Sequence, residues 1–155
     1  MSLKEYKEKR NFRKSPEPKE SKAKKKNEGL AYVIQKHQAS HLHFDLPLEE
    51  GGVLKSWAIP KLPPQEEGTR RLAVETEDHP LAYAEFEGII PEGEYGAGRV
   101  EIWDSGTYVS LESGPTKKVF EVSGKKLGGR YCLIKLKPKE TEDKSWLFFK
   151  LKNPL

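Results

Sequence analysis

One short segment of the chain concentrates residues that could bind a metal. Three of the four histidines in these 155 residues, His37, His41 and His43, lie within nine positions of Asp45. Imidazole nitrogens and carboxylate oxygens are common ligands of divalent transition metals. Alternate residues of a strand point to the same face, so His41, His43 and Asp45 would share one face, opposite the apolar residues between them. The segment predicts either a metal site or the polar, metal-free face of an edge strand.

Four further residues have the chemistry to act on a phosphate group. His79 precedes a proline, which keeps it out of a helix and places it at a strand end or in a loop, and Tyr83 follows shortly after. Lys61 and Arg71 are isolated cations next to turn residues, where an ordinary surface charge is the alternative interpretation. Together these groups match the needs of phosphate chemistry. A metal polarises a phosphoryl oxygen and activates water, while cations and a histidine hold the other oxygens.

The elements that must position these residues are short strands. From Leu30 onward, runs of apolar, β-branched and aromatic residues alternate with Gly, Pro and Ser, at spacings typical of an all-β barrel or sandwich. No segment in this part shows a sustained helical period. We therefore predict an all-β, mainly antiparallel fold, a compact β-barrel of about eight strands. Strands are expected within residues 31–34, 42–48, 53–59, 72–76, 86–90, 100–103, 107–111, 119–122, 131–136 and 146–151.

The first 28 residues differ in composition from the remainder. They hold 11 Lys or Arg against 5 Glu, whereas residues 29–155 hold 17 against 19 acidic residues. We expect a basic N-terminal arm and linker over residues 1–28, with a short helical or extended start, followed by the barrel domain over residues 29–155. A basic arm on a near-neutral body favours a polyanionic partner such as nucleic acid, and a solubilising tail is the alternative.

Cysteine content and hydropathy bear on the cellular location of the protein. The single Cys132 excludes an internal disulfide and a cysteine-based zinc cluster, which favours a reducing, cytoplasmic location. The charged N-terminus lacks the apolar core of a signal peptide, and no run of about 18 apolar residues predicts a membrane span.

Several blocks of the sequence resemble the 3′-phosphoesterase domain of bacterial DNA ligase D, here as a stand-alone protein. They follow one another in order at residues 34–37 (IQKH), 40–45 (SHLHFD), 54–61 (LKSWAIPK), 77–83 (EDHPLAY) and 86–98 (FEGIIPEGEYGAG). In the arm, residues 9–12 (KRNF) and 15–18 (SPEP) resemble the N-terminal signature of that family.

This resemblance implies an activity that trims DNA 3′ ends during repair. Such domains remove a terminal ribonucleoside and then the 3′-phosphate to leave a 3′-hydroxyl, using Mn²⁺, with Zn²⁺ or Co²⁺ as alternative ions. The implied partners are DNA 3′ ends and a DNA ligase or other repair protein, and we expect a monomer. Carried over by position, the metal ligands would be His37, His43 and Asp45. The catalytic residues would be His79, Tyr83, Lys61, Arg71, Arg10 and Glu17.

Two positions depart from the family pattern. Pro47 stands where the family usually has an arginine that contacts phosphate, and Asn11 replaces an aspartate. Because a terminal phosphate is close to a dianion, it depends on a cation more than a diester does. We expect weaker removal of the 3′-phosphate than of the ribonucleoside, unless His41 or Arg70 compensates.

Other interpretations remain open from sequence alone. A nucleic-acid-binding barrel without catalysis would explain the arm but not the histidines. A non-haem iron oxygenase would use His43, Asp45 and His79 as its metal-binding triad. The glycines of the run Gly93-x-x-Gly96-x-Gly98 are expected to form a tight turn, since no helix follows to make a nucleotide-binding loop. Glu77 and Asp78 could orient ligand histidines or be solvated carboxylates.

Overall fold

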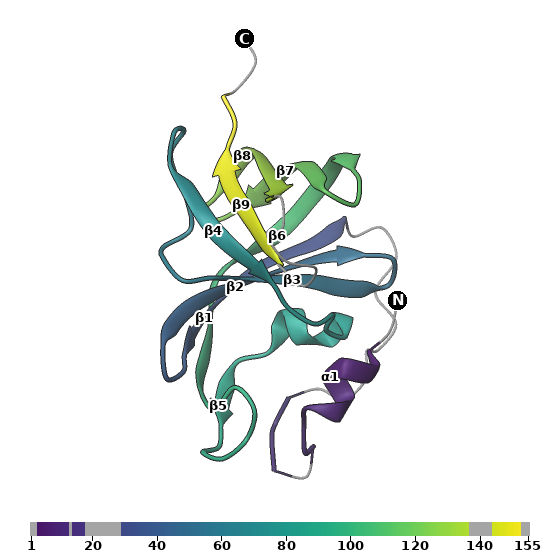
Figure 1. Cartoon of the computed structure of the whole chain (residues 1–155), viewed down its shortest axis with the longest axis vertical. Coiled ribbons are helices and arrows are strands. Elements are labelled where there is room, and N and C mark those ends of the chain that lie inside the picture. The colour runs from purple at the N-terminus through teal and green to yellow at the C-terminus, as the bar shows by residue number, and fades with distance from the viewer. Residues whose placement is uncertain (1–2, 13, 18–28, 137–143, 153–155) are drawn as a thin grey trace.

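The computed structural model describes residues 3–12, 14–17, 29–136 and 144–152. It contains nine strands, one short α-helix and one 3-10 helix (Figure 1). The helices are α1 (Lys4–Glu8) and η1 (Leu81–Glu85). The strands are β1 (Leu30–Gln38), β2 (Leu42–Glu50), β3 (Val53–Ile59), β4 (Arg70–Glu75), β5 (Gly88–Ile90), β6 (Gly98–Ser113), β7 (Lys117–Gly124), β8 (Gly128–Lys135) and β9 (Ser145–Lys150). No helix in the described part of the chain is long and apolar enough to cross a membrane.

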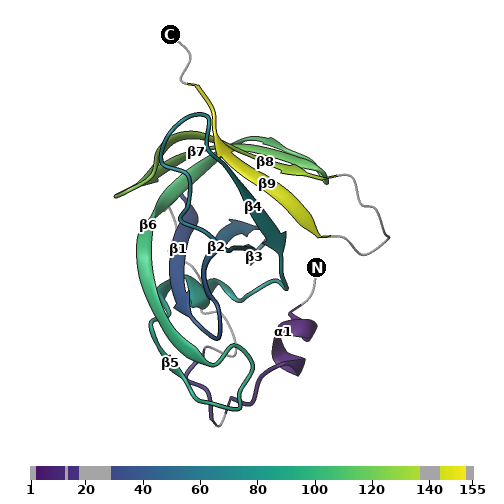
Figure 2. The ribbon, with the colours of Figure 1, turned by 60° about the vertical axis from the view of Figure 1, so that its left-hand side comes forward.

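The sheet closes into a barrel of eight antiparallel strands. The strand order is β1-β2-β3-β4-β9-β8-β7-β6-β5, and an additional pairing of β1 with β6 joins the two sides (Figure 2). β5 lies outside this closed ring and pairs only with the first residues of β6. The prediction of a compact, mainly antiparallel β-barrel of about eight strands is confirmed.

The barrel interior is filled by alternate residues of its strands. Leu46 of β2, Trp57 of β3 and Phe148 of β9 are almost completely buried in one apolar cluster. Aromatic rings of different strands pack against each other there, with Trp57 and Trp146 edge to face and Phe120 stacked on Phe148. Phe44 and Leu46 of the histidine segment point into this cluster, so His43 and Asp45 between them must point outward.

Strand β6 differs from the sequence-based expectation. Two strands were predicted, at residues 100–103 and 107–111, with a turn at Ser105 and Gly106. The structure has one strand of 16 residues that passes through both. Gly106 pairs with Tyr32 of β1 on one side and with Gly124 of β7 on the other, and a Cβ at this glycine would lie 2.0 Å from the carbonyl oxygen of Ser123. Gly106 therefore permits a close approach of the strands and does not form a turn.

A second apolar cluster lies outside the barrel. It joins Tyr6 of α1, Tyr83 of η1 and Ile90 of β5 to Leu54, which points outward from β3. The side chain of Gln35 on β1 donates to the carbonyl oxygen of Tyr83 at 2.7 Å and holds η1 against the sheet. The start of the arm, η1 and β5 thus cover one outer face of the barrel, as Figure 1 shows.

Asp104 of β6 fixes the turn between β7 and β8. Its carboxylate accepts hydrogen bonds from the backbone N–H groups of Lys125, Lys126 and Leu127 and from the hydroxyl of Tyr32, each at 2.8 or 2.9 Å. Burial alone would raise the pKa of Asp104, but these donors outweigh it and hold the pKa below its usual value. The carboxylate is therefore ionised at neutral pH and stabilises the fold there.

Replacing Asp104 with alanine is expected to lower the free energy of unfolding by roughly 3 kcal/mol at pH 7, because four donors, two of them buried, lose their acceptor. Since the pKa is depressed in the folded state, this contribution is complete above the ordinary aspartate pKa. It is lost as the pH falls through the folded value, so the difference from the wild type should narrow in acid. Urea denaturation of both proteins at pH 7 and at a pH well below the ordinary aspartate pKa measures this, with Glu101→Ala on the same strand as the control. An unchanged urea midpoint at pH 7 would contradict the assignment.

Candidate active site

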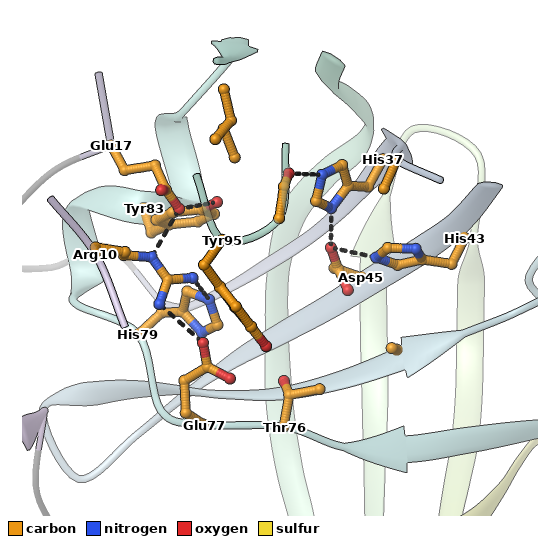
Figure 3. Close-up of a pocket in the computed structure, with 14 residues that line it drawn as sticks. Arg10, Glu17, His37, His43, Asp45, Thr76, Glu77, His79, Tyr83 and Tyr95 are labelled. Carbon is orange, nitrogen blue, oxygen red and sulfur yellow. Dashed lines mark hydrogen bonds and ion pairs between the residues drawn. The ribbon is translucent and has the colours of Figure 1, made fainter. Parts of the chain in front are cut away.

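A pocket of about 310 Å³ opens between the outer face of the barrel and the elements that cover it. Figure 3 shows its two groups of polar side chains, one on β1 and β2 and the other between the arm and η1. Its lining residues are Arg10, Glu17, His37, Ala39, His43, Asp45, Ala58, Thr76, Glu77, His79, Tyr83, Ile90, Tyr95 and Gly96.

The first group consists of His37, His43 and Asp45. His37 of β1 lies directly opposite His43 of β2, and Asp45 is the next residue of β2 on the same face. Oδ2 of Asp45 lies 3.4 Å from Nδ1 of His37 and 3.3 Å from Nε2 of His43. One ligand atom from each of the three residues lies within 4.8 Å of the other two. Two imidazoles and a carboxylate at this separation can bind one divalent ion.

The orientation of both rings supports this interpretation. Nε2 of His37 lies 2.7 Å from the carbonyl oxygen of Gly96, and Nδ1 of His43 lies 3.1 Å from that of His41. A carbonyl only accepts, so these two nitrogens carry the protons. The lone pairs then lie on the nitrogens that face Asp45. This is the usual arrangement of a metal-binding histidine, whose second nitrogen donates to a neighbouring acceptor.

The carboxylate of Asp45 is in the ionised form that a metal requires. Burial would raise its pKa, but the neighbouring His37 and His43 rings outweigh this effect and hold the pKa at about 2. The donor set and its charge state therefore fit a divalent transition metal.

The second group is centred on Arg10, whose side chain is only 5% exposed. Its Nε donates to Glu17 and its Nη1 to Glu77, both at 2.9 Å, and its guanidinium lies 4.0 Å from the centre of the Tyr6 ring. Glu17 also accepts from the hydroxyl of Tyr83 at 2.8 Å. The arm is thus held by buried ion pairs and contributes directly to the pocket.

His79 lies beside Arg10 and is neutral at pH 7. It is joined to Leu54 of β3 by two backbone hydrogen bonds, and its ring packs edge to face on Tyr83. Burial lowers the pKa of His79, and Arg10 lowers it further, against the opposite effect of Glu77. Nη2 of Arg10 lies 3.4 Å from Nε2, which must accept because a guanidinium only donates. The proton is then on Nδ1, which is buried and has no hydrogen-bond partner among the residues that the structure describes.

The structure separates the predicted site residues into two sets. His37, His43, Asp45, His79, Tyr83, Arg10 and Glu17 line one pocket. Lys61 and Arg71 do not line it. Lys61 is exposed after the end of β3, and Nε of Arg71 donates to the carbonyl oxygen of Leu62 at 2.7 Å.

The positions that depart from the family pattern also lie outside the lining. Pro47 is buried on β2, and Asn11 is exposed in the arm. His41 is exposed in the turn between β1 and β2, and Arg70 lies over the ring of Phe149 on the β4–β9 side of the barrel.

Sequence reasoning did not identify two contributors to the pocket. Tyr95 was contained in the glycine-rich run that predicted only a turn, although an aromatic residue between turn glycines is a signal of exposure. Glu77 was left between two interpretations, and the structure buries it against Arg10. The partner of Glu77 is 67 positions away in the chain, which no local pattern indicates.

The fold and the site define a β-barrel protein with a candidate His₂Asp metal centre next to a buried arginine and a neutral histidine. Residues 35–135 match the model of the DNA Ligase D 3′-phosphoesterase domain. The chain belongs to this family.

Three relatives are multifunctional non-homologous end joining proteins named LigD. The chain is 46% identical to the protein of Pseudomonas aeruginosa, 44% to that of Mycobacterium tuberculosis and 40% to that of Mycolicibacterium smegmatis. These alignments cover 96 or 97% of this chain but only 19 or 20% of the relatives. The chain therefore spans about a fifth of the length of the relatives it matches.

Proposed function

We propose that this protein is a metal-dependent phosphoesterase that processes the 3′ ends of DNA in repair. The proposed reactions are removal of a 3′-terminal ribonucleoside and of a 3′-phosphate, with Mn²⁺ as the ion. The observation that carries the proposal is the presence, in one pocket, of the His37–His43–Asp45 triad and the Arg10–His79 pair. The membership of the family supports the same reaction class.

In this proposal the two groups of pocket residues have different roles. His37, His43 and Asp45 would hold the ion, which when bound supplies a Lewis acid for a phosphoryl oxygen and lowers the pKa of water. Arg10 offers a fixed positive charge to a second phosphate oxygen. Neutral His79 can accept a proton at Nε2, the nitrogen beside Arg10, which is the behaviour required of a general base.

Glu17, Glu77 and Tyr83 are positioning residues in this scheme. The two carboxylates hold the guanidinium of Arg10 in one orientation, and the hydroxyl of Tyr83 fixes Glu17. A charge held in place before the substrate arrives does not have to reorganise during the reaction, which makes it more effective. Lys61 and Arg71 would assist phosphate binding from outside the pocket lining. There they could contact a DNA strand that leaves the site.

A panel of divalent ions tests the proposal. Duplexes that carry either a 3′-ribonucleotide or a 3′-phosphate are incubated with the protein and Mn²⁺, Zn²⁺, Co²⁺, Mg²⁺ or a chelator, and the products are resolved by length. We expect products with a 3′-hydroxyl in Mn²⁺ and none with the chelator. Binding of the duplex without any product would favour the non-catalytic barrel. A requirement for oxygen would favour the oxygenase, so the panel is repeated anaerobically.

We further propose that Pro47 weakens the phosphatase step relative to ribonucleoside removal. Pro47 follows Asp45 by two residues on β2, so its side chain points to the same face, about 6–7 Å further along the strand. The β1–β2 register passes from Gln35–Asp45 to Tyr32–Leu48 without Leu46 or Pro47, which fits a residue that has no N–H to donate.

Replacing Pro47 with arginine is expected to increase kcat/KM for the 3′-phosphate about 10-fold relative to the ribonucleoside end. The reason is that a charge-assisted hydrogen bond contributes about 1.5–3 kcal/mol. Pro47→Met, which has a long side chain without charge, is the matched control. Equal turnover of both ends by the wild-type protein would remove the basis for this expectation.

A further inference from the structure

Tyr95 is an exposed aromatic side chain inside the proposed active site. The residue is 47% exposed although it lines the pocket, and it is the one aromatic residue among the large hydrophobic residues exposed in the described part of the chain. The other pocket residues discussed above are charged, hydrogen-bonded or buried. An exposed aromatic ring in a pocket that takes nucleic acid is a candidate contact for a base or a sugar.

The loop that carries Tyr95 is held in a defined conformation. Hydrogen bonds from Glu94 N to Pro91 O and from Ala97 N to Glu94 O close two successive turns, and the backbone φ angle of Gly96 is +75°. The carbonyl oxygen of Gly96 accepts the hydrogen bond from Nε2 of His37. The residue next to Tyr95 therefore also orients a candidate metal ligand, so the ring has a fixed place relative to the metal centre.

The ring lies between the two halves of the pocket. Figure 3 shows it crossing from its loop toward Thr76, with the triad on one side and Arg10 and His79 on the other. Nζ of Lys9 lies 4.8 Å and Cζ of Arg10 lies 5.2 Å from the centre of the ring. A nucleotide whose phosphate contacts both halves of the pocket must therefore pass close to Tyr95.

The alternative is that Tyr95 only holds the arm against the barrel. The arm, however, is already held by other contacts. Arg10 is already held by Glu17, Glu77 and the Tyr6 ring, whose centre is 1.2 Å closer to Arg10 Cζ than that of Tyr95 (4.0 Å against 5.2 Å). Lys9 also pairs with Glu77 at 3.4 Å. The arm has these contacts without Tyr95, and Tyr95 is exposed enough to contact another partner.

We propose that Tyr95 contacts the terminal nucleoside of the substrate and thereby sets a preference for nucleoside-bearing ends over bare 3′-phosphates. This inference rests on the proposed function and names the part of the substrate that the pocket distinguishes. The triad and Arg10 serve phosphate oxygens, which both substrates have. An aromatic ring stacks on a base or a ribose, which only the ribonucleoside end presents beyond the scissile phosphate.

The test compares two substrates with two substitutions. Values of kcat/KM are measured for duplexes of one sequence that end in a 3′-ribonucleoside or a 3′-phosphate, with Tyr95→Ala, Tyr95→Phe and the wild-type protein. We expect Tyr95→Ala to reduce kcat/KM about 10-fold more for the ribonucleoside end than for the phosphate end. Tyr95→Phe keeps the ring and should keep the wild-type ratio within about 3-fold. Val109→Ala, at an exposed apolar residue on β6 outside the pocket lining, is the control.

The outcomes separate this inference from the proposed function. A wild-type protein that turns over neither substrate overturns both. An active wild-type protein with an unchanged substrate ratio in Tyr95→Ala overturns only the role of Tyr95. If Tyr95→Phe loses the ratio as fully as Tyr95→Ala does, the hydroxyl and its 3.4 Å contact with Lys9 are responsible, and stacking is rejected.

Discussion

Replacing Asp45 with asparagine is expected to abolish phosphoesterase activity, with a loss of about 1,000-fold or more in the rate. A bound metal contributes several kcal/mol of charge stabilisation to the transition state, and each 1.36 kcal/mol is a factor of ten in rate. Asp45 is the anionic member of the triad and faces both histidines. With its pKa at about 2 it is fully ionised at neutral pH, so the amide removes a whole charge from the ligand set.

Two measurements check this prediction. Titration calorimetry with Mn²⁺ alone should show that Asp45→Asn has lost binding, and rates on the 3′-ribonucleotide duplex should fall in parallel. The matched control is His41→Ala, which removes an exposed histidine from the same segment and leaves the carbonyl oxygen that accepts from His43. If Asp45→Asn keeps Mn²⁺ affinity and activity within 10-fold of the wild type, the triad is not the metal site.

Replacing Arg10 with alanine is expected to have the second largest effect, on both rate and stability. Loss of one preorganised charge-stabilising donor costs about 2.7–4 kcal/mol of barrier, which is roughly 100- to 1,000-fold in rate. The same substitution leaves Glu17 and Glu77 buried without their cation. Removing one partner of a buried ion pair typically costs about 3–5 kcal/mol, so the arm should detach from the barrel.

A double substitution separates these two effects. Arg10→Ala combined with Glu77→Gln removes one of the uncompensated charges, so it should recover part of the unfolding free energy but none of the rate. Lys14→Ala, at an exposed cation of the same arm, is the control and should change neither quantity. Urea denaturation and single-turnover rates give the two readouts. A full rate in Arg10→Ala would show that the arm only covers the site.

The pH dependence of the Arg10–Glu77 ion pair follows from the pKa of Glu77. Burial raises the pKa of Glu77, but hydrogen bonds from a backbone N–H and from the guanidinium of Arg10 bring it below the ordinary value. The stability gained from the pair is therefore present at neutral pH and is lost as the pH falls through the depressed pKa. The stability difference between wild type and Arg10→Ala should accordingly shrink in acid.

Local sequence was sufficient for the fold class and for the face of the strand on which His43 and Asp45 lie. Alternation of apolar and polar residues has a period of two, and this period alone decides that Phe44 and Leu46 point inward while His43 and Asp45 point outward. The position of His37 did not follow from this period, because the strand predicted at residues 31–34 ends before it. In the structure β1 continues to Gln38, and the short turn after it brings His37 opposite His43. The resemblance to the 3′-phosphoesterase family was inferred from sequence blocks between residues 34 and 98. The match to the family model confirms it.

Tertiary structure alone decided which distant groups meet the triad. Closure of the barrel through β1 and β6, and the packing of the arm on its outer face, bring Arg10 to Glu77 and set Tyr95 across the pocket. The same closure leaves Lys61 and Arg71 outside the lining. The physical reason is that periodicity fixes the face of a side chain within its own strand. Contacts between elements far apart in the chain depend on the packing of the whole molecule, to which every element contributes.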